Sequence, residues 1–188
     1  MGLGMLSGYD PRVVANALIE AARRANIPMR NVSIQKLLYF AHASFLVHYR
    51  RPLVRGAFEA WEYGPVCRPI YDALKGYGRN EVTSLIRRRD PYTGEESELP
   101  PLSDATAQSH IERVMHVMGR ATPSQLISLS HVDGGAWSIV WNKSKTGATV
   151  GNRIDDGLTI ATFGKLKVAL KPAEMQEGLD EATPFAGD

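Results

Sequence analysis

Cysteine and long apolar segments are both scarce in this chain. Cys67 is the single cysteine among 188 residues, so an internal disulfide framework is excluded. No apolar run approaches the roughly 20 residues that a membrane-spanning helix needs. Residues 1–8 carry no basic flank before their apolar residues, so they do not resemble a secretory signal. These absences predict a cytoplasmic protein without a membrane partner, whose first eight residues are flexible.

The chain also lacks histidines spaced for metal binding. His42 and His48 are six residues apart in one predicted helix, and His110 and His116 are six apart in another. Two imidazoles that share a metal ion on a helix are usually four residues apart. The sequence therefore predicts no metal site and no cofactor.

Nucleophilic catalysis has few candidates. Cys67 follows a predicted turn and precedes a short helix, a position that can lower the pKa of a thiol, and His131 with Asp133 would complete a triad if folding brought them together. The alternative is that Cys67 is buried and packs as a small apolar residue. We predict the second reading, with no catalytic residues, and keep a cysteine- or metal-dependent hydrolase as the enzyme alternative.

Charge is nearly balanced overall but unevenly distributed. The net charge is +2, and the last 15 residues contain five acidic residues and no basic one. Residues 50–89 are basic, a composition that suits either a solvated surface or contact with an acidic protein or nucleic acid. This segment leaves a DNA-binding regulator as an alternative function. The basic residues are Arg50, Arg51, Arg55, Arg68, Lys75, Arg79, Arg87, Arg88 and Arg89.

Residues 61–78 combine large aromatic side chains with an obligatory change of chain direction. Gly64 is unrestricted in φ, whereas Pro65 fixes φ and has no amide hydrogen, so we expect residues 63–66 to form a turn that neither continues a strand nor lies in a helix. Residues 58–63 are predicted to be extended and residues 69–74 helical, with Gly76 and Gly78 ending the helix.

The remaining segments predict a mainly helical domain. Asp10 is placed to cap a helix that begins at Pro11, and an apolar helix over residues 32–49, centred on Leu38, is expected to lie in the middle of the core. Thr122 and Gln125 form a predicted capping box for a helix that ends near His131. Further helices are expected at 104–119, 136–142 and 159–170, a loop or hairpin at 79–103, and a short extended piece at 148–154.

Four motifs resemble the Panacea, or SocA-like, family of antitoxin-associated proteins. They are Tyr-Asp-Pro with Val-Ala-Asn at 9–16, Gln-Lys-Leu-Leu-Tyr-Phe-Ala at 35–41, Phe-Glu-Ala-Trp-Glu-Tyr-Gly-Pro-Val at 58–66 and Lys-Gly-Tyr-Gly at 75–78. A weaker similarity covers residues 126–137. The resemblance implies an antitoxin that neutralises a separately encoded protein toxin by direct binding. It also implies an association with a Clp-type unfoldase or protease, to which such a protein delivers the toxin as an adaptor.

The predicted fold is therefore mainly α (α+β): a single helical domain over residues 9–170, built around a central apolar helix, with a small β element near residues 54–63. Residues 171–188 are expected to form a disordered acidic tail. We expect Trp61 and Trp137 in the core, and His42 and His131 as hydrogen-bonded structural residues. The predicted partner-binding residues are Tyr63, Gly64, Pro65, Val66, Arg68 and Tyr71. The alternative is that both tyrosine rings pack inward and the turn only joins two core elements.

Overall fold

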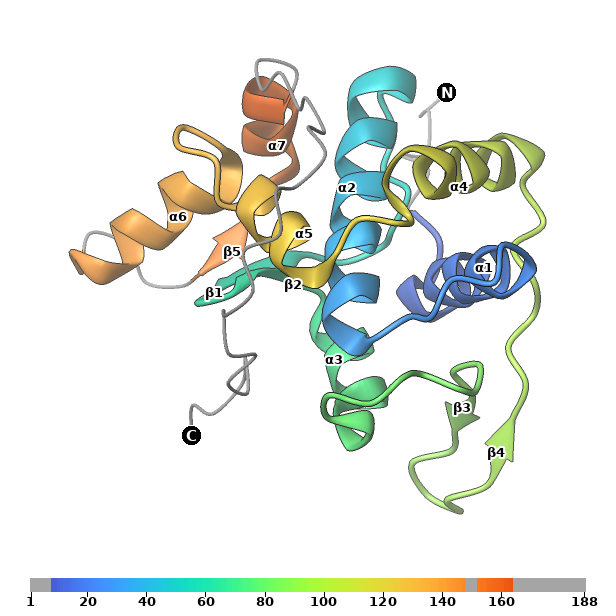
Figure 1. The fold of residues 1–188 in the computed structure, drawn as a ribbon. Coiled ribbons are helices and arrows are strands. Elements are labelled where there is room, and N and C mark those ends of the chain that lie inside the picture. Colours follow the sequence, from blue (N-terminus) through green and yellow to red (C-terminus); the bar gives the residue numbers. More distant parts are fainter. Residues whose placement is uncertain (1–7, 148–151, 164–188) are drawn as a thin grey trace, which may run out of the picture.

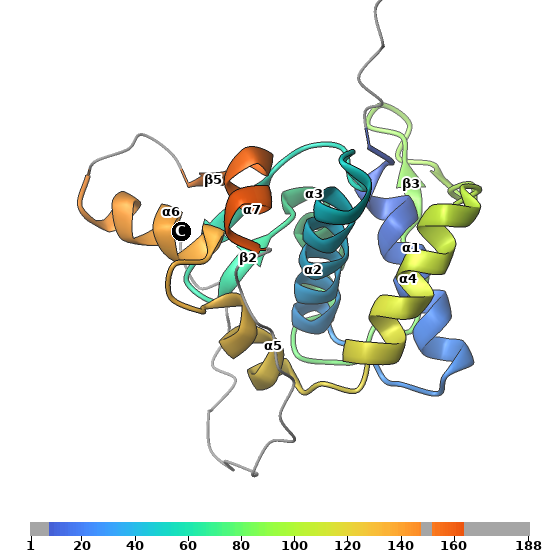
Figure 2. The ribbon, with the colours of Figure 1, turned by 90° about the horizontal axis from the view of Figure 1, so that it is seen from above.

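Helix α2 (Asn31–Tyr49) runs through the middle of the fold, as expected for a helix that is apolar around its whole circumference. The computed structural model describes residues 8–147 and 152–163. Helices α1 (Pro11–Arg24) and α4 (Ala105–Met118) lie on one side of α2 (Figures 1 and 2). A small sheet lies on the other side, together with helices α5 (Pro123–Ser130), α6 (Ala136–Lys145) and α7 (Asp156–Phe163). The predicted mainly α fold with a small β element is confirmed.

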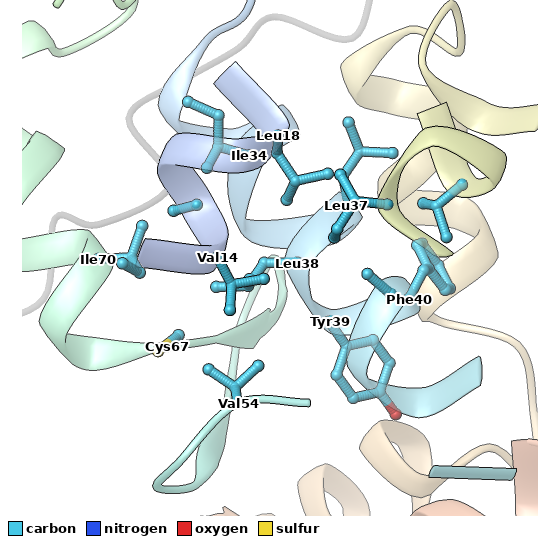
Figure 3. Packing of buried hydrophobic residues seen from close by; sticks show 14 of the residues in the cluster. Val14, Leu18, Ile34, Leu37, Leu38, Tyr39, Phe40, Val54, Cys67 and Ile70 are labelled. Carbon is cyan, nitrogen blue, oxygen red and sulfur yellow. The ribbon is translucent and has the colours of Figure 1, made fainter. Parts of the chain in front are cut away.

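The core is continuous around α2. Leu38 is fully buried, and the side chains of α1, α2, α3 and the segment at Val54 interdigitate beside it (Figure 3). Cys67 lies among these apolar side chains. Burial of this many apolar groups is the main source of stability in a domain of this size.

Hydrogen bonds and an ion pair connect the N-terminal end of the domain with the segment around Arg51 and with the start of α4. Asp10 caps α1 as predicted, accepting a hydrogen bond from the Arg12 amide at 2.9 Å. The hydroxyl of Tyr9 donates to the carboxylate of Asp104, which also pairs with Arg51 at 2.9 Å and caps α4. These partners, led by Tyr9, lower the pKa of Asp104 to about 2.

The small sheet corrects one prediction. Strand β1 (Phe58–Trp61) pairs antiparallel with β2 (Gly64–Val66), and only Glu62 and Tyr63 form the turn between them. The expectation that residues 63–66 could not form a strand was therefore wrong. Pro65 is tolerated because β2 is the edge of the β2-β1-β5 sheet, where a missing amide hydrogen breaks no ladder. Strand β5 (Arg153–Ile154) pairs with the other edge of β1.

Most of the other predicted elements are confirmed. Helix α3 (Arg68–Leu74) leads into a 3₁₀ turn, η1 (Lys75–Tyr77), and the hairpin of β3 (Arg88–Arg89) with β4 (Glu96–Ser97) occupies the loop region. Helix α5 (Pro123–Ser130) has the predicted capping box. Helix α6 (Ala136–Lys145) is longer than expected.

Helix α7 (Asp156–Phe163) starts three residues before the predicted position. The side chain of Asp155 accepts hydrogen bonds from the amides of Gly157 and Leu158, at 2.8 and 3.2 Å, and this cap sets the earlier start. The flexible start over residues 1–7, the extended piece over 148–151, the last helix beyond Phe163 and the acidic tail at 171–188 lie outside the described residues. Within the described part of the chain, no helix is long and apolar enough to cross a bilayer.

Candidate partner-binding surface

The six predicted partner-binding residues divide into two groups in the structure. Gly64, Pro65 and Val66 are buried, so they can position the surface residues but cannot contact a partner directly. Tyr63 and Tyr71 are half-buried and Arg68 is exposed, so these three side chains face outward at least in part. Their role in binding stays a prediction.

Trp61 joins this group although we expected it in the core. Its indole ring is half-buried and makes an edge contact with Tyr71, with ring centroids 5.0 Å apart. The guanidinium carbon of Arg68 lies 5.0 Å from the centroid of the Trp61 ring, and the indole nitrogen donates to Glu59 at 2.7 Å. Trp61, Arg68 and Tyr71 thus form one contiguous set, which we call the Trp61 cluster.

Two buried polar residues of α2 hold the backbone behind this cluster. The side-chain oxygen of Gln35 accepts from the amide of Cys67 at 2.8 Å, and its nitrogen donates to the carbonyl of Cys67 at 3.3 Å. The Nζ of Lys36 donates to the carbonyl of Pro65 at 3.0 Å. Lys36 is 1% exposed, and burial lowers its pKa to about 7.

Gly64 is needed because its backbone lies very close to the side chains of Ser130 and Lys36. Its φ is +99°, a conformation that side chains with a Cβ rarely adopt. A Cβ at this position would lie 2.5 Å from the Oγ of Ser130 and 2.9 Å from the Nζ of Lys36. Strand β2, which follows the Glu62–Tyr63 turn, is therefore packed tightly against Ser130 and Lys36.

Aromatic packing fixes the other side of the turn. Trp137 is buried as predicted, and its indole nitrogen donates to the carbonyl of Trp61 at 2.8 Å. The ring of His131 stacks on Trp137 with centroids 3.7 Å apart and an interplanar angle of 6°. We predicted a hydrogen-bonded His131, but its Nε2 is buried and has no hydrogen-bond partner among the described residues. Burial, followed by the nearby Lys36, lowers the pKa of His131 to about 4.

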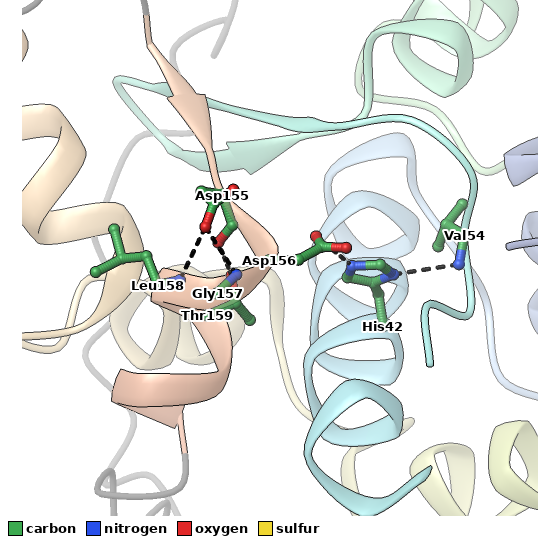
Figure 4. A network of polar contacts seen from close by, with 7 residues as sticks. All are labelled: His42, Val54, Asp155, Asp156, Gly157, Leu158 and Thr159. Atoms are coloured by element: carbon green, nitrogen blue, oxygen red, sulfur yellow. Dashed lines mark hydrogen bonds and ion pairs between the residues drawn. The ribbon is translucent and has the colours of Figure 1, made fainter. Parts of the chain in front are cut away.

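His42 is a structural residue, as expected. Its Nδ1 accepts from the Val54 amide at 3.2 Å, so the proton lies on Nε2, which faces the carboxylate of Asp156 at 3.1 Å (Figure 4). The imidazole is 1% exposed and joins α2 to the start of α7. Both ring nitrogens are thereby engaged in holding elements together.

Cys67, the candidate nucleophile, lies in an apolar environment. Cys67 is 3% exposed, and burial raises the pKa of its thiol to about 12, which disfavours the thiolate that a nucleophile requires. Among residues 8–147 and 152–163, no three histidine, cysteine or acidic side chains are grouped to hold a metal ion. Cys67 thus has the properties of a small buried apolar residue.

The basic middle segment is divided among several contacts. Arg51 pairs with Asp104 and lies over the ring of Phe45, with its guanidinium carbon 4.8 Å from the ring centroid. Arg87 lies 3.9 Å from the carboxylate of Glu96 in the β3–β4 hairpin. Arg51 and Arg87 are thus each engaged by a carboxylate within the domain.

Sequence reasoning missed the roles of Gln35 and Lys36. The available signal was an adjacent polar pair inside a helix that is mostly apolar, because buried polar groups are retained where they satisfy backbone groups. In the structure, both side chains bind the backbone of residues 65–67.

Comparison with known proteins identifies the family. The family described as Antitoxin SocA-like, Panacea domain matches residues 34–138. This range includes the two α2 residues that support the turn, the turn itself and Trp137. Antitoxin SocA of Caulobacter vibrioides (strain NA1000 / CB15N) is 39% identical to this chain over 176 residues, which cover 93% of this chain and 94% of the relative. No solved structure gives a significant match. The chain therefore belongs to the SocA-like antitoxin family that carries the Panacea domain.

Proposed function

We propose that this protein is the antitoxin of a toxin–antitoxin pair and neutralises a separately encoded protein toxin by direct contact, without catalysis. The observation that carries this proposal is the 39% identity to Antitoxin SocA along 93% of the chain. The buried, protonated thiol of Cys67 and the engaged ring of His42 are consistent with a binding role.

We place the toxin contact at the Trp61 cluster and Tyr63. Aromatic and arginine side chains dominate the energetics of many protein interfaces, and a rigid surface loses less entropy on binding. Here Arg68 and Tyr71 both contact the ring of Trp61, and Trp137 binds the backbone of Trp61 from below. The side chains are thus positioned before a partner arrives.

Co-expression with the product of the neighbouring gene tests the function. Growth arrest caused by that product should be relieved, and the two proteins should co-purify. A toxin that stays fully lethal while this protein is abundant and folded would refute the antitoxin role.

Charge changes test the surface separately. Arg68→Glu and Tyr71→Glu should weaken co-purification, because they place a carboxylate against the ring of Trp61 or remove its aromatic neighbour. The matched control is Arg88→Glu in the exposed β3 strand. If both cluster variants keep native circular dichroism and melting and bind like the control, toxin contact lies elsewhere on the protein.

The finer proposal is that binding delivers the toxin to a Clp-type protease. An adaptor needs one surface for its cargo and another for the unfoldase, and the basic segment at 50–89 and the acidic residues of 174–188 differ in charge. With purified components, the toxin should be degraded faster when this protein and the Clp-type protease are both present. A toxin half-life that does not change would leave neutralisation by blocking alone.

A DNA-binding regulator remains the alternative, suggested by the arginines of the middle segment. Helix α5 carries no lysine or arginine, unlike a typical recognition helix. A gel shift at several salt concentrations separates the two functions, since binding through phosphates weakens steeply as salt rises.

A further inference from the structure

A charged cleft lies away from the Trp61 cluster, at the end of the fold where α2 begins. Its volume is about 530 Å³. It is lined by Ser33 of α2 and by three separate segments: residues 27–30 before α2, residues 79–81 after η1, and residues 119–123, which run from the end of α4 to the first residue of α5. Figure 2 shows the α1–α2 and α4–α5 connections at the same end of the helices.

The walls of the cleft are held by hydrogen bonds of the backbone and of a helix cap. The amide of Val82 donates to the carbonyl of Met29 at 2.7 Å, and Arg30 and Glu81 form an antiparallel β-bridge. On the opposite wall, Thr122 and Gln125 close the capping box of α5. These bonds hold the segments that line the cleft in place.

The cleft is basic at its exposed positions and apolar in part. Arg30, Arg79 and Arg120 come from the three different segments, and Glu81 is the single carboxylate among the described residues that line the cleft. Arg79 and Arg120 make no ion pair with any residue in the described ranges. The apolar lining is Ile27, Pro28, Met29, Ala121 and Pro123.

This lining favours a polypeptide over a nucleic acid. None of the described residues that line the cleft is aromatic, so these residues offer nucleobases no ring to stack on. Helix α5 begins with a proline, and Thr122 and Gln125 already occupy amides at its start, so few backbone donors remain for a phosphate. Carboxylates interspersed with apolar side chains match both the arginines and the apolar lining.

We propose that this cleft binds the acidic C-terminal segment of the same chain, residues 174–188. That segment contains Glu174, Glu177, Asp180, Glu181 and Asp188, no basic residue, and the apolar residues Met175, Leu179 and Phe185. Its charge and its alternation of acidic and apolar residues complement the cleft. This inference uses none of the residues of the proposed toxin contact. It is an alternative to the use of residues 174–188 as a free surface in the adaptor proposal, because the same segment is here bound to Arg79 and its neighbours.

The connection is long enough. The ten residues 164–173 join α7 to the acidic segment and can span at most about 35 Å when extended. A folded chain of this length has a radius of gyration of about 16 Å. A compact domain of this radius of gyration is about 40 Å across. The 25 residues 164–188 together can extend to about 85 Å, so the acidic segment can reach the cleft over the surface without any rearrangement of α7.

Zero-length cross-linking of the full chain tests the contact. Arg79→Lys and Arg120→Lys each keep the positive charge and introduce an amine, which carbodiimide couples to a carboxylate in direct contact. Arg88→Lys in the exposed β3 strand is the matched control. Mass spectrometry should find cross-links to residues 174–188 severalfold more often from positions 79 and 120 than from position 88. These cross-links should decline near 1 M salt, where the Debye length is about 3 Å.

Two further samples make the result decisive. Neutralising the middle of the acidic segment with Glu177→Gln, Asp180→Asn and Glu181→Gln should reduce severalfold the cross-links from positions 79 and 120 to the two acidic side chains that remain, Glu174 and Asp188. A mixture of ¹⁵N-labelled and unlabelled protein should give cross-links within one isotopic species. Any of four results would overturn the proposal. Two concern the lysine variants: equal yields from all three positions, or no cross-link from positions 79 and 120 in variants with native circular dichroism. The other two are cross-links that persist at full yield in the neutralised variant, and predominantly mixed-isotope products.

Discussion

The buried amine of Lys36 should make the stability of the protein rise with pH. Burial lowers the pKa of Lys36 from about 10.5 to about 7, so between these values the unfolded chain binds one proton more than the folded chain. The free energy of unfolding should then increase by about 1.4 kcal/mol per pH unit across this window. Over the whole window the contribution is about 5 kcal/mol.

Lys36→Met removes the amine while keeping an unbranched side chain of similar length. Removal of the buried charge should raise the free energy of unfolding of the variant by more than roughly 4 kcal/mol at pH 7, by the same arithmetic. It should lose about 1 to 3 kcal/mol because the carbonyl of Pro65 is left without its donor. We therefore expect Lys36→Met to be more stable than wild type by about 1 to 3 kcal/mol at pH 7.

This advantage should shrink by about 3 to 4 kcal/mol between pH 7 and pH 10, and so disappear or reverse sign. Urea unfolding at several pH values measures it, with Lys75→Met, at an exposed position on η1, as the matched control. Using the difference between wild type and variant cancels the titration of other groups. A difference that is constant with pH would show that Lys36 keeps its proton in the fold, and the reasoning from burial would fail.

Single substitutions at Leu38, Cys67 and Gly64 test the packing of the core and of the turn. Leu38→Ala should reduce the free energy of unfolding by about 2 to 5 kcal/mol, measured by urea unfolding, because the fully buried side chain leaves a cavity; an unchanged melting temperature would contradict its place in the core. Cys67→Ser should keep toxin neutralisation, since the thiol is buried and protonated at neutral pH, and loss of neutralisation in the folded variant would reopen the enzyme alternative. Gly64→Ala should lower the melting temperature, because of its φ of +99° and the crowding by Ser130; Gly76→Ala, where a Cβ meets nothing within 4 Å, is the control.

Elements with local signals were predictable from the sequence. The cap at Asp10, the capping box at Thr122 and the apolar run of α2 each depend on residues close together in the chain, and all three are confirmed. The start of α7 was missed because Asp155 caps it from a position that the apolar pattern does not mark.

Pairings between distant segments were not predictable. Strand β2 was read as part of the turn because Pro65 argues against a strand, and only its place at the sheet edge removes that objection. The Trp61 ring is half-buried because it packs against Tyr71 and Arg68 of α3 and not in the core, and this packing depends on how α3 is placed beside β1. Likewise, the stacking of His131 on Trp137 joins two helices across a loop, and nothing in either helix alone indicates it.

The pairing of β5 with β1 has a consequence for synthesis of the protein on the ribosome. Phe58 pairs with Ile154, so one edge of β1 lacks its partner until almost 100 further residues have been translated. At roughly 5 to 20 residues per second, that interval is about 5 to 20 seconds. During this time His42 also lacks the carboxylate of Asp156. The nascent chain therefore passes through a stage in which an open strand edge is available to chaperones or to a second nascent chain.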